Sequence, residues 1–410
     1  MPMTPPDDYD DIDAFVLPAA HGPEAGRPAP KQFQPWHKPR KQWVRNHVLV
    51  QNIRELADKL VFPADSPFFR YLSLPGDDLL DIRLLAPVLH RRGLILNYVG
   101  FNSVGKNSDR ELRLSLAENE VRNLAGVYRD SKIYRDRIEH VGFRDSLQWT
   151  RVRDCSPYHA INIDLCDHIA AKSQDNLPTY ISAVAEIVHL QLKRSRDPWL
   201  LFIATCVAPG SVDAANLAAF ISAIRANIEA SADFGNGLRD VLCREGGELE
   251  AALASPHCLA PERFRDLFSI GFGKWLLHYM GSATPRTKLT LLRSCHYPVG
   301  GEEADLVTLA FRCDPLIEPP VDNYLLVNAG GHPSPEPDEV ACALALIERS
   351  AAMINIHEML TRRPDLYRHL TQESHALLKE SHYPVDRYEE WLREYDPLSG
   401  LLADPVGEVG

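Results

Sequence analysis

Residues 287–315 have the sequence TKLTLLRSCHYPVGGEEADLVTLAFRCDP, and this stretch decides the expected fold. Two apolar runs, 287–298 and 304–315, have the composition of β-strands, with only Val-Gly-Gly-Glu-Glu between them. A connection this short cannot hold a crossover helix, so the two strands must pair antiparallel as a hairpin.

The chain before this hairpin alternates between strand-like and helix-like runs. Strands are expected at 69–76, 94–102, 158–167 and 198–210, and helices at 77–93, 108–124 and 179–194. Such alternation predicts βαβ units, hence an α/β protein with a mostly parallel sheet and helices on both faces. Further helices are expected at 44–60, 212–232 and 262–281, and in segments across 337–398.

Composition limits the class of protein. The 410 residues carry a net charge of −12, which argues against non-specific coating of nucleic acid or anionic membrane. The sequence contains no run of 18 or more apolar residues, so no membrane span is expected. The first residues do not resemble a signal peptide. The eight cysteines form no CxxC pair. We therefore expect a cytoplasmic protein without a disulfide framework or a metal site.

Composition also divides the chain into four segments. Residues 1–30 hold seven prolines and six acidic residues and are expected to be a disordered tail. Residues 31–60 are expected to form a basic, aromatic N-terminal segment and a helix, and residues 61–330 the α/β domain. Residues 331–410 are expected to form a helical extension that offers a surface for protein partners.

The first strand ends in the turn Leu74-Pro75-Gly76-Asp77-Asp78. Ligands of open α/β sheets bind beyond the carboxyl ends of the strands, and Gly76 lets a ligand approach the backbone closely. Asp77 and Asp78 suit a helix N-terminus, which is their structural explanation. They would also repel a phosphate, so a ligand with a cationic centre and hydroxyl groups suits this turn better.

Two other strands end in polar residues. Phe101 and Asn102 close the second strand, where an acidic residue often accepts hydrogen bonds from ribose. Asp164 and Asp167 follow the strand at 158–164, and either carboxylate could hold an amine or act as a base, with His168 as a proton shuttle. Their structural alternatives are a turn residue for Asn102 and a helix cap for Asp167.

Residues 36–45 combine positive charge with two tryptophans. The basic side chains are Lys38, Arg40, Lys41 and Arg45. Interleaved basic and aromatic residues can grip a phosphate backbone and stack bases, which makes this patch a candidate nucleic-acid interface. The alternative is a helix lead-in whose tryptophans pack on the domain.

These features together resemble a class I S-adenosylmethionine-dependent methyltransferase. That family has a Rossmann-like sheet of seven strands with an antiparallel last strand, which the hairpin at 287–315 matches. The order of motifs, with NIDLCD at 162–167, also looks like the bacterial three-Cys-motif partner proteins, many of which are associated with defence loci.

The resemblance implies a function and a set of site residues. It implies S-adenosylmethionine bound by Leu74, Pro75, Gly76, Asp77, Asp78, Phe101 and Asn102, and methyl transfer near Asp164 and Asp167. The basic and aromatic residues at 36–45 favour nucleic acid as the substrate. The chain departs from the family by its single glycine in the first turn, by Asn102 in place of an acid, and by its lack of Asn-Pro-Pro-Tyr. A catalytically degenerate module for binding or assembly, in a bacterial multi-protein system such as anti-phage defence, is therefore the alternative.

Overall fold

A computed structural model describes residues 31–165, 167–173, 177–244, 246–299, 305–316 and 337–403. The acidic segment 1–30 lies outside the described residues, as do Cys166 and the turn residues 300–303. Within the described ranges, no helix combines the length and the apolar character that crossing a membrane requires.

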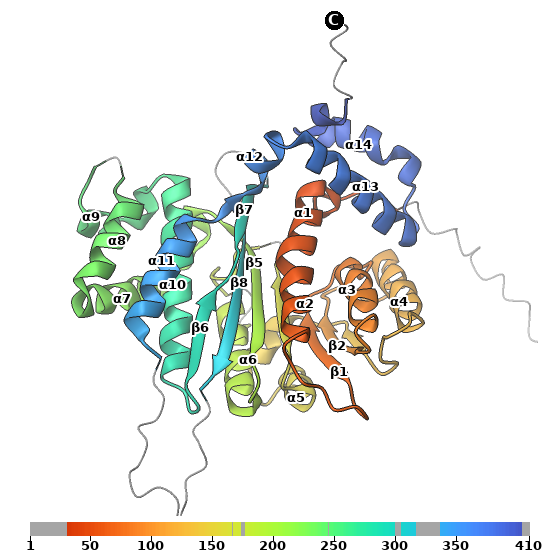
Figure 1. Cartoon of the computed structure of the whole chain (residues 1–410), viewed down its shortest axis with the longest axis horizontal. Helices are drawn as coiled ribbons and strands as arrows, with labels where there is room; N and C mark the ends of the chain where they lie inside the picture. Colours follow the sequence, from red (N-terminus) through yellow and green to blue (C-terminus); the bar gives the residue numbers. More distant parts are fainter. Residues whose placement is uncertain are drawn as a thin grey trace, which may run out of the picture.

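One sheet organises the structure (Figure 1). Its strand order is β3-β2-β1-β4-β5-β8-β7-β9, and β6 also pairs with β8. From β3 to β5 all neighbours are parallel. The strands are β1 (Phe68–Ser73), β2 (Ile95–Phe101), β3 (Lys132–Tyr134), β4 (Ala160–Asp164), β5 (Trp199–Val207), β6 (Thr287–Leu291), β7 (Cys295–Pro298), β8 (Asp305–Pro315) and β9 (Ile354–Asn355). The expected α/β class and mostly parallel sheet are confirmed.

The antiparallel hairpin is also confirmed. β8 pairs antiparallel with β5 on one side and with β6 and β7 on the other. The first strand of the hairpin, expected to be continuous over 287–298, is interrupted at 292–294. There the Ser294 hydroxyl accepts a hydrogen bond from Ala310 N at 3.2 Å and so replaces a ladder bond of the sheet.

Helices cover both faces of the sheet, in the layered arrangement expected of βαβ units. One apolar core joins Leu72, Val99 and Ile161 of the sheet to α5–α8, α10 and α11, and the other joins Phe69, Leu96 and Phe202 to α1–α4, α12 and α13. The helices are α1 (Pro39–Val44), α2 (Gln51–Ala57), α3 (Leu80–His90), α4 (Asp109–Arg122), α5 (Leu147–Cys155), α6 (Tyr180–Arg194), α7 (Ala214–Ala230), α8 (Ala232–Leu242), α9 (Leu249–Ala254), α10 (Pro261–Gly281), α11 (Glu339–Ala351), α12 (Ile356–Thr361), α13 (Pro364–Glu380) and α14 (Tyr388–Tyr395).

Local sequence explains where several helices begin. The side chains of Ser108, Thr179 and Asp213 accept hydrogen bonds from backbone N–H groups in the first turns of α4, α6 and α7. Such caps satisfy donors that a helix leaves unpaired at its start. The start of α4 at Asp109, after Ser108, agrees with the sequence expectation.

The N-terminal and C-terminal elements meet above one edge of the sheet (Figure 1). α1 continues through a π-helical turn, η2 (Arg45–Val50), into α2, and α1 packs against α13. Of the helices that follow residue 337, α11 belongs to one apolar core and α12 and α13 to the other, while Tyr388 and Leu392 of α14 belong to a smaller third cluster. Short 3-10 turns complete the chain at η1 (Pro35–His37), η3 (Ile138–Gly142), η4 (Pro209–Ser211), η5 (Pro256–Cys258), η6 (Val385–Arg387) and η7 (Ser399–Leu402).

Candidate functional site at the carboxyl edge of the sheet

The three strand ends that the sequence singled out lie side by side. Ser73 of β1 is in register with Gly100 of β2 and with Asn162 of β4. Pro75, Asn102 and Asp164 each come two residues after this register position, so Asn102 and Asp164 follow the two strands that flank β1. The expected grouping of the turn after β1, Asn102 and Asp164 at one edge is thus present in the structure.

The turn after β1 is open to solvent on one side and tightly packed on the other. A Cβ atom placed on Gly76 would meet nothing within 4 Å, whereas one on Gly100 would lie 3.0 Å from Pro75 Cδ. Leu79, at the end of the turn, is fully buried with a φ of 54°. A non-glycine residue in this left-handed region costs about 1–2 kcal/mol. The turn is therefore held in one shape by its surroundings, with open space beside Gly76.

Asp77 and Asn102 join the first two loops of the edge. Arg110 donates two hydrogen bonds to the Asp77 carboxylate, at 2.7 and 3.0 Å. Asn102 Nδ2 donates to Pro75 O at 2.9 Å and to Asp77 Oδ1 at 3.1 Å, and Asn102 Oδ1 accepts from Val104 N at 3.0 Å. Phe101 is buried beneath this junction, 5.6 Å from the Tyr134 ring. Leu74 packs against the first apolar core.

Asp78 is bound by residues from both ends of the described chain. Its carboxylate accepts hydrogen bonds from the Lys31 ammonium and from the Tyr383 hydroxyl. Burial, and then the nearby Asp78 charge, raise the pKa of Tyr383. Tyr383 therefore stays protonated and able to donate to Asp78 at physiological pH.

Asp164 pairs with a buried lysine. Lys41 Nζ lies 2.6 Å from Asp164 Oδ2 and 2.8 Å from Oδ1, and Lys41 is only 6% exposed. Burial alone would lower the pKa of Lys41, but the charges of Asp164, Tyr297 and Asp81 outweigh it and raise that pKa. Lys41 therefore stays protonated and holds the Asp164 side chain from within the chain.

Asp167 and His168 have other surroundings. Asp167 is exposed and its Oδ1 accepts a hydrogen bond from His168 N at 2.8 Å. His168 is buried, its Nδ1 accepts from Ala170 N at 2.9 Å, and burial lowers its pKa to about 4. A buried, neutral imidazole does not favour the proton shuttle that the sequence suggested at His168.

The basic patch is used inside the protein. Arg40 pairs with Asp396 at 3.2 Å, and Arg45 with Asp81 at 2.7 Å. Arg40 and Arg45 are each only 5% exposed. The Lys38 ammonium donates to Tyr395 O, and burial lowers the pKa of Lys38. In this arrangement Arg40, Lys41 and Arg45 face carboxylates, not solvent.

The sequence did not point to several residues that complete this edge. Tyr383 follows α13 and Asp396 follows α14, and no local pattern places them here. Tyr297 is the second-to-last residue of β7, which runs parallel to β5. The predicted hairpin therefore did contain a signal that this residue lies at the same edge. The Tyr297 ring lies 5.8 Å from the Arg40 guanidinium, and burial raises the pKa of Tyr297 to about 12.

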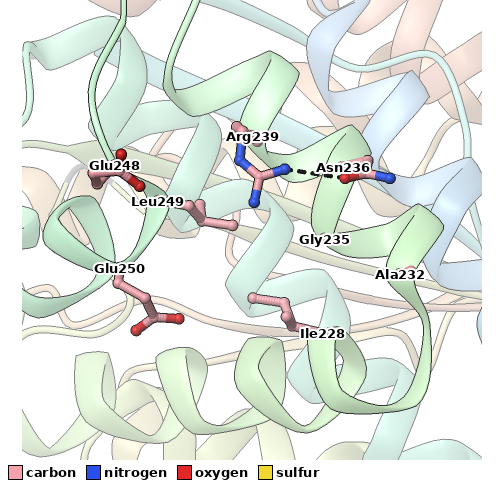
Figure 2. A pocket seen from close by; sticks show the side chains of 8 residues that line it. All are labelled: Ile228, Ala232, Gly235, Asn236, Arg239, Glu248, Leu249 and Glu250. Carbon is pink, nitrogen blue, oxygen red and sulfur yellow. Dashed lines mark hydrogen bonds between the residues drawn. The ribbon is translucent and has the colours of Figure 1, made fainter.

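Two hollows in the surface lie away from this edge. One, of about 270 Å³, lies between α7, α8 and α9. Figure 2 shows Arg239 in it, bonded to Asn236 at 3.0 Å, and Glu248 and Glu250 on the facing segment. The other, of about 410 Å³, is lined by residues 57–67 and 92–94, near the amino ends of β1 and β2. Across the described ranges no three His, Cys, Asp or Glu side chains are grouped to hold a metal ion.

Comparison with known proteins gives one result. A family model described as PP_RS20740-like matches residues 30–393. No curated protein matches the chain. The matched span includes the N-terminal helix, the whole sheet and most of α14, while Asp396 and η7 lie beyond it.

Proposed function

The chain belongs to the PP_RS20740-like family, and we propose that it is a methyltransferase-type protein that binds S-adenosylmethionine where β1 and β2 end. The observation that carries this proposal is the strand order β3-β2-β1-β4-β5-β8-β7. β8 is inserted antiparallel between β5 and the broken strand of β6 and β7. This inserted strand is the feature on which the resemblance to class I methyltransferases rests.

Several residues at the edge fit the proposed ligand. The open space beside Gly76 would admit it, and Asp77 and Asp78 suit its cationic groups. Asn102 Oδ1 accepts one hydrogen bond, from Val104 N, whereas an amide oxygen can accept two. Asn102 therefore retains acceptor capacity for a ribose hydroxyl. S-adenosylmethionine, when bound, supplies an activated methyl group.

Asp164 and Asp167 are the candidate residues for the acceptor side. Asp164 would take a proton from an attacking group only after Lys41 has left its carboxylate, because the Lys41 ammonium contacts both of its oxygens. Asp167 is exposed on the next loop and is reachable without such a change. The contacts of Arg40, Lys41 and Arg45 do not favour the patch at 36–45 as a nucleic-acid interface.

A binding or assembly component without catalysis is the second candidate. The observation that favours it is the engagement of Asp77, Asp78, Asp81 and Asp164 with cations or hydroxyls of the same chain. Such internal pairing stabilises an edge that does no chemistry.

Calorimetric titration with S-adenosylmethionine and S-adenosylhomocysteine separates the two candidates. The first requires micromolar binding to the unmodified chain and a large loss of affinity in Gly76→Leu. Absence of heat for both ligands at millimolar concentration contradicts it and favours the assembly role.

A further inference from the structure

Residues 31–41, KQFQPWHKPRK, lie across the carboxyl edge, and we call them the strap. The strap contains four basic residues and no acid. Its Lys31 ammonium binds Asp78, and its Lys41 ammonium binds Asp164. Arg40 Nη1 donates to Pro298 O at 3.3 Å and the guanidinium lies near the Tyr297 ring. Each cation of the strap that faces the sheet therefore meets an anionic, carbonyl or aromatic partner.

The sheet beneath the strap offers further polar groups. Tyr71 and Ser73 are fully buried, and Ser73 and Asn162 are side-chain hydrogen-bond partners of Tyr71. Burial, and then the charge of Asp81, raise the pKa of Tyr71, and Asp164 adds to this. Ser73 is in register with Asn162, two residues before Asp164. Hydroxyl and carboxylate oxygens together form a surface suited to ammonium and guanidinium groups.

The C-terminal helices hold the strap from its other side. Phe33 packs against Tyr383, Tyr388 and Trp391, with ring centroids 5.7, 5.3 and 5.3 Å away. The Tyr388 hydroxyl donates to His37 O at 2.6 Å. Beyond Val44 the helix changes to π-helical hydrogen bonding at Arg45, a local irregularity that is frequent at functional sites. We call the contacts of Phe33 and His37 with the C-terminal residues the anchors of the strap. They involve other residues than the contact of Lys41 with Asp164.

We propose that the strap is the chain's own occupant of a cation-binding cleft, and that the ligand which takes its place is a basic polypeptide segment. The carboxylates of Asp78 and Asp164 attract lysine and arginine and repel a phosphate backbone. The inference rests on the proposed function, because it takes this cleft as the place where the methyl acceptor binds. The substrate class is then a basic protein.

The test weakens the anchors of the strap in the full chain. Lys31→Gln removes the ammonium that binds Asp78 and Ser381 O, and Phe33→Ala removes the packing against Tyr383, Tyr388 and Trp391. Both changes leave the contact of Lys41 with Asp164 in place. The probe is a fluorescent peptide with the strap sequence, compared with one in which Lys38, Arg40 and Lys41 are glutamine. Lys193→Gln with Phe143→Ala changes the same residue types at exposed positions outside the strap and is the matched control.

We expect the anchor variant to bind the basic peptide about tenfold more tightly than the unmodified chain and the control do. The gain must disappear with the glutamine peptide and shrink as salt is raised. Tyr388→Phe, which removes the hydroxyl that donates to His37 O and keeps the ring, must change affinity in the same direction by less. It covers the case in which the double variant does not fold. Equal binding of the two peptides, or tighter binding of a DNA oligonucleotide of the same length, overturns the inference.

Titration of the same variants with S-adenosylhomocysteine separates this inference from the proposed function. Peptide binding without S-adenosylhomocysteine binding overturns the methyltransferase proposal but still supports the cation-binding cleft. S-adenosylhomocysteine binding with no preference for the basic peptide overturns the cleft alone.

Discussion

Lys41 and Asp164 form a buried ion pair that joins the first helix to the end of β4, with 2.6 Å between Nζ and Oδ2. The two residues are 123 positions apart in the sequence. Because the pKa of Lys41 is raised above 10.5, the stabilisation by this group is complete below about pH 10.5. It is lost only as the pH rises through the raised pKa of the folded state. The pair therefore fixes α1 on the sheet throughout the physiological range.

Removal of Asp164 is predicted to lower the free energy of unfolding more than removal of Lys41. Asp164→Asn leaves the Lys41 ammonium buried without its counter-charge, and we expect a loss of about 3–5 kcal/mol in the free energy of unfolding. Lys41→Met leaves the Asp164 carboxylate, whose side chain is 21% exposed, partly solvated, so a loss of about 1–2 kcal/mol is expected. Urea denaturation of both variants measures the difference. Equal losses would contradict the description of Lys41 as the more deeply buried charge.

The junction between the first two loops gives a second prediction. Asn102→Ala removes the donor to Pro75 O and the acceptor for Val104 N in a buried place, and we expect a loss of about 1–3 kcal/mol in the free energy of unfolding. Arg110→Ala removes an ion pair whose arginine side chain is 60% exposed, and exposed pairs contribute about 0–1 kcal/mol. Chemical denaturation of both variants checks the order. A larger loss for Arg110→Ala would mean that the ion pair, not the amide, holds the two loops together.

The sequence was sufficient for most of the sheet, because long apolar runs such as 198–210 and the short hairpin connection have few alternatives. It did not reveal β3, which has three residues, or α5, where LQWTRVRDC is polar and has little apolar periodicity. Gly76, Asn102 and Asp164 could be grouped because parallel strands end at one edge. The burial of Arg40 could not be predicted, since its partner Asp396 lies 356 residues away and local composition carries no information about that contact.

Acid is predicted to destabilise the protein through His168. Burial lowers the pKa of His168 from 6.5 to about 4. Above pH 6.5 the imidazole is neutral in both the folded and the unfolded chain. As the pH falls from 6.5 toward 4, the unfolded chain binds a proton that the folded chain does not, so the free energy of unfolding falls. The full effect is about 3 kcal/mol. His168→Asn retains an acceptor for Ala170 N but does not titrate, so the free energy of unfolding should fall less steeply between pH 6.5 and 4.5. His278→Asn, at an exposed position, is the control and should leave that slope unchanged.

Gly76 offers the sharpest separation of ligand binding from folding. A side chain at this position would meet no atom within 4 Å, and Gly76 does not have a positive φ. Gly76→Leu should therefore change the melting temperature little, because a residue that fits its backbone without strain alters mainly the entropy of the unfolded chain.

The same side chain would fill the open space beside the turn. A ligand that approaches the backbone there should lose at least about tenfold in affinity, which calorimetry measures. Gly281→Leu, at the end of α10 and also without neighbours, should leave affinity unchanged. If Gly76→Leu binds S-adenosylhomocysteine as tightly as the unmodified chain does, the ligand does not lie against this turn.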